Sequence, residues 1–66
     1  MEYTNSRMLH LIDEHIHSER DRAILRRKLI DDITFEEMEE EFSLTARQIR
    51  RIVHKHEMTL FRHYSD

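Results

Sequence analysis

The stretch from Thr34 to Lys55, TFEEMEEEFSLTARQIRRIVHK, decides the fold of this 66-residue chain. Thr34-Phe35-Glu36-Glu37 and Thr45-Ala46-Arg47-Gln48 both match the capping box, in which a threonine and a glutamate or glutamine three residues later begin a helix. Only Ser43-Leu44-Thr45 links the two predicted helices, and every Lys and Arg of the stretch lies in the second one. This outline is typical of a helix-turn-helix, whose second helix enters a DNA major groove.

Two further helices are predicted on the N-terminal side. The first begins at Thr4 or Asn5 and ends at His17, and its apolar residues recur at helical spacing. The second begins at a variant capping box, Ser18-Glu19-Arg20-Asp21, and ends at Asp31-Asp32, because aspartate tolerates a left-handed helix end. Glycine and proline are absent, which argues against strands and tight turns. We expect one all-α domain, a four-helix helix-turn-helix without winged elements, with helices at 1–17, 18–32, 34–43 and 45–64.

Composition excludes several classes of protein. The chain contains no cysteine, so it has neither a disulfide framework nor a thiolate metal site. No apolar run approaches the roughly 18 residues of a membrane-spanning helix, so we expect no membrane partner. The first residues lack the basic and apolar regions of a signal peptide. A cytoplasmic location is therefore expected.

The charges are segregated along the chain. Residues 1–42 contain six Lys or Arg and twelve Asp or Glu, a net charge of −6, whereas residues 43–66 contain five and two, a net charge of +3. Together these give the overall charge of −3. DNA responds to the field within roughly 8 Å at physiological salt, so the basic C-terminal part outweighs the acidic total.

The fourth predicted helix has two distinct faces. Its apolar face is expected to carry Ile49, Ile52, Val53, His56 and Leu60, with the arginines on the opposite side. Arginine binds phosphates and reads guanine edges, and the first residues of a recognition helix reach deepest into the groove. The candidate base-contacting residues are Ala46, Arg47, Gln48 and Arg51, and the candidate phosphate-contacting residues are Thr45, Arg50, His54 and Lys55. Thr45 is expected to offer its hydroxyl or the helix N-terminal amides.

Other features have simpler interpretations as well. A basic helix face by itself is most often a solvated surface. Met58 and Phe61 lie on the arginine side, and they either pack on the first helix or form a partner or dimer contact. The six histidines do not form a metal-binding pattern, because structural zinc needs four ligands, and His56 is expected at the edge of the core. The glutamates of the third helix are interpreted as a solubilising face with some exposed ion pairs to the arginines of the second helix.

Five segments carry a family resemblance: Asp21-Arg22-Ala23-Ile24-Leu25, 33–38, 40–42, Leu44-Thr45 and 47–52. With them, the stretch from about Ser18 to Tyr64 resembles region four of the sigma-70 family of RNA polymerase specificity subunits. It is also similar to the small region-four-like proteins of Firmicutes phages and mobile elements. The resemblance implies a helix-turn-helix fold, binding to double-stranded DNA and contact with RNA polymerase.

The departures from that family limit what is carried over. Glu39 stands where the family has a small residue, and Ser43 and Asp32 stand at positions where glycine is common. Housekeeping members read a promoter element with an Arg-Glu pair, and here the corresponding residues are Ala46 and Arg47. The DNA target is therefore not inherited. The chain also has no room for the other sigma regions, so it is not expected to direct initiation alone.

The sequence thus predicts a DNA-binding transcription regulator that inserts the helix starting at Thr45 into the major groove. The main alternative is a protein-interaction module that docks on RNA polymerase or another partner, and a second is a structural or assembly protein of a phage. A homodimer is a possible partner state, because one recognition helix reads few base pairs and two-fold pairing doubles that number. No residues suggest catalysis, so we expect neither an enzyme nor a cofactor.

Overall fold

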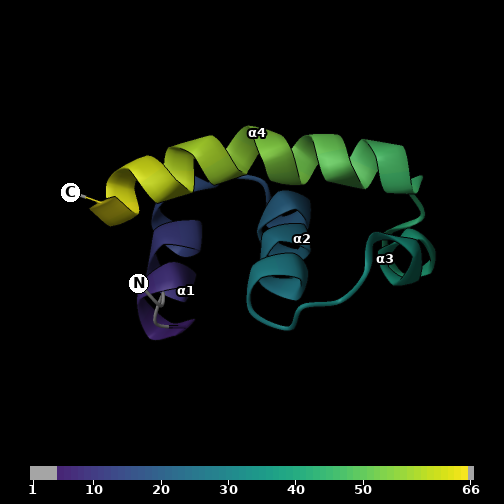
Figure 1. Ribbon diagram of the computed structural model, residues 1–66, viewed down its shortest axis with the longest axis horizontal. Helices are drawn as coiled ribbons and strands as arrows, with labels where there is room; N and C mark the ends of the chain where they lie inside the picture. The colour runs from purple at the N-terminus through teal and green to yellow at the C-terminus, as the bar shows by residue number, and fades with distance from the viewer. Residues whose placement is uncertain (1–4, 66) are drawn as a thin grey trace.

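The polypeptide forms four α-helices joined by short connections (Figure 1). The computed structural model describes residues 5–65, with the backbone alone for Ser65, so Thr4, one of the two predicted starts of the first helix, lies outside these residues. The helices are α1 (Asn5–His15), α2 (Glu19–Leu29), α3 (Phe35–Phe42) and α4 (Ala46–Ser65). No strand occurs within 5–65, which confirms the predicted all-α class with four helices.

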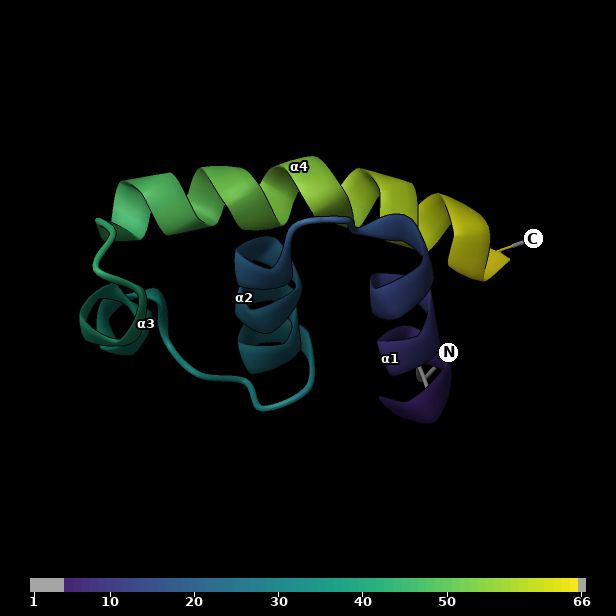
Figure 2. The same cartoon turned by 180° about the vertical axis from the view of Figure 1, so that it is seen from behind.

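α4 runs the length of the molecule, and the three other helices pack against one side of it (Figure 1, Figure 2). At about 1.5 Å per residue, this helix of 20 residues accounts for most of the longest dimension of 33 Å. α2 lies between α1 and α3, which do not contact each other. The other side of α4 is covered by no described element.

The core lies between α4 and the three shorter helices, and all of its buried residues are apolar. α4 contributes Ile49, Val53 and Leu60, which are at most 3% exposed, while Ile52 and His56 are half-buried at its edge. The apolar face predicted for this helix is therefore confirmed. The other buried residues are Met8, Leu11, Ile12, Ile16, Ile24, Leu25 and Met38.

The first helix ends earlier than predicted, at His15 instead of His17. The Ile16 N–H still bonds to the carbonyl oxygen of Ile12 at 3.1 Å, and the chain then turns toward α2. Arg22 Nη1 donates to the carbonyl oxygens of Ile16 at 2.9 Å and of His17 at 3.2 Å. A side chain of α2 therefore satisfies carbonyl groups that a longer α1 would have bonded itself.

The second helix also ends early, at Leu29 instead of Asp32. Asp32 nevertheless adopts the left-handed conformation predicted for it, with φ 54°, and Ser43 after α3 does the same with φ 56°. Such a conformation costs an L-residue roughly 1–2 kcal/mol. At both sites it changes the direction of the chain between two helices, so packing of those helices must offset the cost.

Capping side chains fix the starts of the helices as predicted. Ser18 Oγ accepts the N–H of Asp21 at 3.2 Å, and Thr34 Oγ1 accepts the N–H of Glu37 at 3.2 Å. Each bond satisfies one of the N–H groups that have no partner within the first turn of a helix. The predicted starts of α2 and α3 are therefore confirmed, and each depends on residues that are close in sequence.

Candidate nucleic-acid interface

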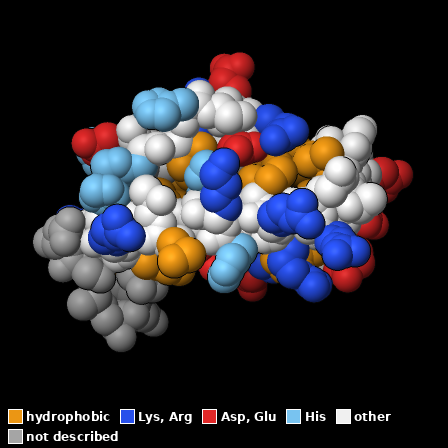
Figure 3. Space-filling model, turned by 90° about the horizontal axis from the view of Figure 1, so that it is seen from above, with side chains coloured by type: hydrophobic (Ala, Val, Ile, Leu, Met, Phe, Trp, Pro, Cys, Tyr) orange, Lys and Arg blue, Asp and Glu red, His pale blue; other side chains and the backbone are white. Residues whose placement is uncertain are grey.

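The side of α4 that faces away from the other helices carries a row of cations. Arg47, Arg51, Lys55 and Arg62, here called the cationic row, are all exposed. Their spacings of four, four and seven residues place them on one side of the helix. Viewed onto α4, Lys and Arg side chains gather mainly at the end of the molecule that holds α3 (Figure 3).

No member of the cationic row takes part in an ion pair or a hydrogen bond within the described part of the chain. Cations on α2 do have acidic partners: Arg20 Nη2 lies 3.1 Å from Asp21 Oδ1, and Arg26 Nη1 lies 3.4 Å from Asp13 Oδ1. The charges of the cationic row are therefore available to an anion outside the chain.

Arg50 lies beside the cationic row, on the α3 side of the helix. Its guanidinium carbon is 5.3 Å from the centre of the Phe35 ring, and Lys28 Nζ lies 4.4 Å from the same ring centre. Cation–π contacts of this kind contribute about 0.5–1 kcal/mol at exposed sites. Arg50 is thus drawn toward α3, which suits contact with a flanking phosphate better than contact with a base edge.

The connection between α3 and α4 is organised by Glu39. Its carbonyl oxygen accepts the N–H groups of Ser43 and, at 3.3 Å, Leu44. Its side-chain Oε2 accepts the N–H of Ala46, the first residue of α4, at 2.6 Å. One residue of α3 therefore binds two N–H groups of the connection and the first N–H group of α4. A carboxylate is also stabilising at this position, because the N-terminus of a helix carries partial positive charge.

Thr45 and Gln48 form the capping box predicted for them. Thr45 Oγ1 accepts the Gln48 N–H at 3.1 Å, and Gln48 Oε1 accepts the Thr45 N–H at 2.9 Å. The N–H groups of Thr45 and Ala46 thus have acceptors within the chain, Gln48 and Glu39 respectively. The Thr45 hydroxyl hydrogen and the Gln48 NH₂ group remain as donors for an outside partner.

The two nearby histidines of α4 point in different directions. His54 is exposed beside the cationic row, where it was predicted. His56 is turned inward, and its Nε2 lies 2.9 Å from Oδ2 of Asp21 on α2. The prediction that His56 lies at the edge of the core is confirmed, and the structure adds a carboxylate partner for one of its ring nitrogens.

Met58 and Phe61 differ in their exposure, although both lie on the arginine side of the sequence pattern. Met58 is 63% exposed. Phe61 is half-buried and packs against the hydrophobic core. The packing interpretation therefore applies to Phe61, and a contact with a partner stays a prediction that is better supported at Met58.

The acidic residues concentrate on α3 and near the end of α2. Glu36, Glu37 and Glu40 are exposed. Arg27 binds Glu41, with Nη2 2.9 Å from Oε1, and its Nη1 lies 3.3 Å from Asp31 Oδ2. The pKa of Arg27 is raised above its usual value. The main cause is the hydrogen bonding to Glu41, and the next is the hydrogen bond to Asp31. The expected ion pairs between the acids and the α2 arginines are thus present at this site.

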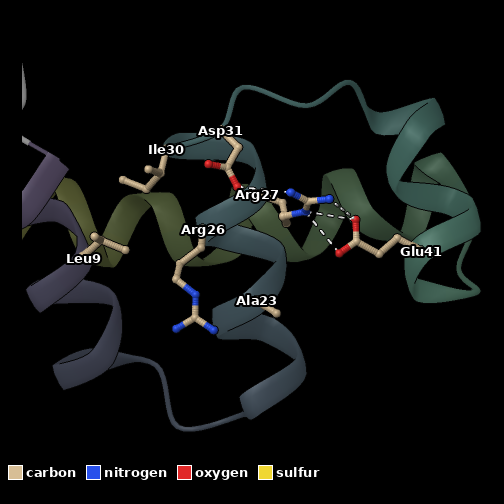
Figure 4. Close-up of a pocket in the computed structure, with 7 residues that line it drawn as sticks. All are labelled: Leu9, Ala23, Arg26, Arg27, Ile30, Asp31 and Glu41. Atoms are coloured by element: carbon tan, nitrogen blue, oxygen red, sulfur yellow. Dashed lines mark hydrogen bonds and ion pairs between the residues drawn. The ribbon is translucent and has the colours of Figure 1, made fainter.

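These paired charges line a shallow cavity of about 240 Å³ between α1, α2 and α3 (Figure 4). It is lined by Leu9, Ala23, Arg26, Arg27, Ile30, Asp31 and Glu41. Because both arginines already bind carboxylates, the cavity presents little unmatched charge to a ligand. We do not assign it a role in the interface.

Several histidines of the described residues have partners other than a metal cluster. Within 5–65, no three His, Asp or Glu side chains converge in a way that would hold a metal ion. His10 instead pairs with Glu14 at 3.0 Å, and the rings of His15 and His63 stack with centroids 3.8 Å apart. No helix in this part of the chain is both long and apolar enough to span a membrane.

Comparison of the chain with known protein families, with curated proteins and with solved structures finds no match. The assignment of the interface therefore depends on the geometry of α4 and its neighbours.

Two residues that matter for this surface were not among the candidates named from the sequence. Arg62 extends the cationic row, and its spacing of seven residues from Lys55 was a usable signal. Glu39 was noted only as a departure from a family pattern. Its hydrogen bond to Ala46 depends on the path of the connection, which no local sequence signal specifies.

Proposed function

We propose that the protein is a cytoplasmic DNA-binding transcription regulator in which α4 is the recognition helix. The observation that carries this proposal is the cationic row: four exposed Lys or Arg side chains on the uncovered side of one helix, without acidic partners within 5–65. Arginine and lysine on a single helix face are the electrostatic footprint of a nucleic-acid interface.

The arrangement of α3 and α4 supports a helix-turn-helix interpretation. A three-residue connection joins the helices, and α3 is seen nearly end-on when α4 lies lengthwise (Figure 1), so their axes cross steeply. This is consistent with the sequence resemblance to sigma-70 region four and to small phage or mobile-element regulators. In such a motif the second helix lies in the major groove.

Within this proposal the residues of α4 have different tasks. Arg47 and Arg51 face outward near the start of the helix and are assigned to base edges, with Ala46 and Gln48 beside them. Lys55, His54 and Arg62 lie farther along and are assigned to phosphates, as are Arg50 and the Thr45 hydroxyl. Two copies on a two-fold site are expected, because one helix of this kind contacts few base pairs.

The acidic side of α3 restricts how a duplex approaches. Glu36, Glu37 and Glu40 are exposed and would repel phosphates on that side. The uncovered side of α4 carries the cations that have no acidic partner within the described residues. The charge distribution therefore favours one orientation of DNA, with α4 in the groove and the outer side of α3 turned away.

A second function is favoured by a separate observation. Met58 is 63% exposed on the same side of α4, and exposed apolar residues are a common part of protein interfaces. In this alternative the protein docks on RNA polymerase or another protein through Met58 and the acidic side of α3. Met58 lies between Lys55 and Arg62 on this side, so DNA and a protein partner would compete for the second half of α4.

Amide chemical-shift mapping tests the proposal and separates the two functions. Addition of duplex DNA is expected to shift the signals of residues 45–55 and 62, and to leave residues 36–41 unchanged. Shifts confined to the cavity between α1, α2 and α3 would contradict the proposal. Polymerase added without DNA should affect Met58 and its neighbours only if the docking alternative is correct.

A further inference from the structure

Every backbone N–H group from Ser43 to Ala46 has a hydrogen-bond acceptor, and most of these bonds converge on one residue. The N–H groups of Ser43, Leu44 and Ala46 all bond to Glu39, the first two to its carbonyl oxygen and the third to its carboxylate. The remaining N–H, that of Thr45, bonds to Gln48. No N–H between 43 and 46 is left to water, so the path of the connection is closely defined.

The Glu39 carboxylate is well suited to hold α4 against α3. The bond of 2.6 Å is short, as expected for a charged acceptor, and it is partly shielded from water. It joins the middle of α3 to the first residue of α4, across a separation of seven residues. The other side-chain bonds of the junction, between Thr45 and Gln48, lie within α4 and its cap and do not reach α3.

We propose that Glu39 is a positioning residue that sets the direction of α4 relative to α3. By fixing the first turn of α4, it determines where Arg47 and Arg51 lie on the outer side. This inference extends the proposed DNA-binding function and, for its effect on affinity, rests on it. The effect of Glu39 on the orientation of α4 does not depend on DNA binding.

Removal of this carboxylate should change the affinity for DNA in opposite directions, depending on whether its charge or its positioning of α4 matters more. An acid close to a DNA-binding helix repels phosphates, so its removal should tighten binding if charge alone mattered. If Glu39 positions the recognition helix, its removal should weaken binding, because side chains held in the wrong place lose their contacts. The sign of the change therefore distinguishes the two effects.

The test compares substitutions at Glu39 with matched substitutions at Glu40, an exposed neighbour on the same helix. We expect E39A to weaken binding to duplex DNA about tenfold. E39D keeps the charge but is one methylene shorter, so it should weaken binding as well. E39Q, whose side-chain oxygen can still accept the Ala46 N–H, should retain most of the affinity. E40A and E40Q should bind as tightly as the wild type or more tightly.

Affinity that rises equally in E39A and E40A would overturn the inference, since charge alone would then explain both. E39D provides the same test if E39A does not fold, because binding by E39D at the wild-type level would also overturn it.

Residual dipolar couplings of α3 and α4 in the free protein give a measurement without DNA. They should report a changed interhelical orientation in E39A and E39D and an unchanged one in E39Q. An unchanged orientation in E39A would contradict positioning even if the protein binds no DNA. Failure of the wild type to bind DNA would instead contradict the proposed function.

Discussion

His56 and Asp21 join α4 to the first turn of α2, with Nε2 of the imidazole 2.9 Å from Oδ2 of the carboxylate. The two side chains are only 16% and 13% exposed, and they are 35 residues apart in the chain. This polar contact lies at the edge of an otherwise apolar core and links the start of α2 to the middle of the proposed recognition helix.

The Asp21 contact predicts a loss of stability in acid. Burial by itself raises the pKa of Asp21, but the hydrogen bond with His56 and the contacts with Arg20 outweigh it, so the pKa lies below the ordinary 3.8. A carboxyl group whose pKa is lowered by folding stabilises the protein above its unfolded pKa. That contribution is lost as the pH falls through the lower, folded value.

We therefore expect Asp21→Asn to be less stable than the wild type near neutral pH, with the difference shrinking below pH 3.8. Thermal unfolding followed by circular dichroism across this range measures the difference. Asp13→Asn is the control, because the Asp13 side chain is 64% exposed. A difference for Asp21→Asn that stays constant down to the lowest pH would show that ionisation of this carboxylate does not stabilise the fold.

Leu60 and Met58 should respond very differently to truncation, although they are two residues apart on α4. Leu60 is fully buried, and Leu60→Ala is expected to lower the free energy of unfolding by about 2–5 kcal/mol. A domain of this size has only a few kcal/mol of net stability, so the variant should be largely unfolded. Met58 is 63% exposed, and Met58→Ala should change stability by about 0.5 kcal/mol or less. Urea denaturation provides both values, and equal losses would mean that α4 is packed differently.

Arg47 and Arg62 are expected to affect DNA binding in different ways. Arg47 is assigned to a base edge, so Arg47→Ala should reduce the preference for the best site over other sequences, by about 1–3 kcal/mol. Arg62 is assigned to a phosphate, so Arg62→Ala should weaken binding to all sequences alike. Selection of bound sequences from a random pool, followed by titration of the best and a scrambled site, measures both effects. An equal loss on both sites for Arg47→Ala would remove it from base recognition.

Much of the fold could be predicted because its signals are local. The capping bonds of Ser18, Thr34 and Thr45 join residues three apart and are present in the structure, and at Thr45 the reciprocal bond with Gln48 completes the capping box. The buried face of α4 follows from helical periodicity alone. The predicted C-terminal ends of the helices were less accurate. α1 ends before His17 because the chain turns at Ile16 and the carbonyl groups there bond to Arg22.

The features that could not be predicted depend on distant parts of the chain. Sequence spacing identified His56 as a residue of the core edge but did not identify Asp21 as its partner. The pattern placed Phe61 with the arginines, whereas packing covers part of it. Glu39 differed from the family pattern in the sequence, but its bond to the start of α4 could not be seen there. Each of these outcomes requires the path of the chain in three dimensions.

The outer side of α4 is proposed to bind DNA, and the decisive measurement is the salt dependence of binding. Fluorescence anisotropy of a labelled duplex should give a wild-type affinity that falls steeply with salt. Lys55→Ala with Arg62→Ala, which removes two cations assigned to phosphates, should weaken binding and reduce the slope of log K against log salt by about 1.8, or roughly 0.9 for each lost phosphate contact. Arg20→Ala with Arg26→Ala removes the same charge from α2 and should leave the slope nearly unchanged. Binding that is insensitive to salt, or equally impaired in both double variants, would contradict the account.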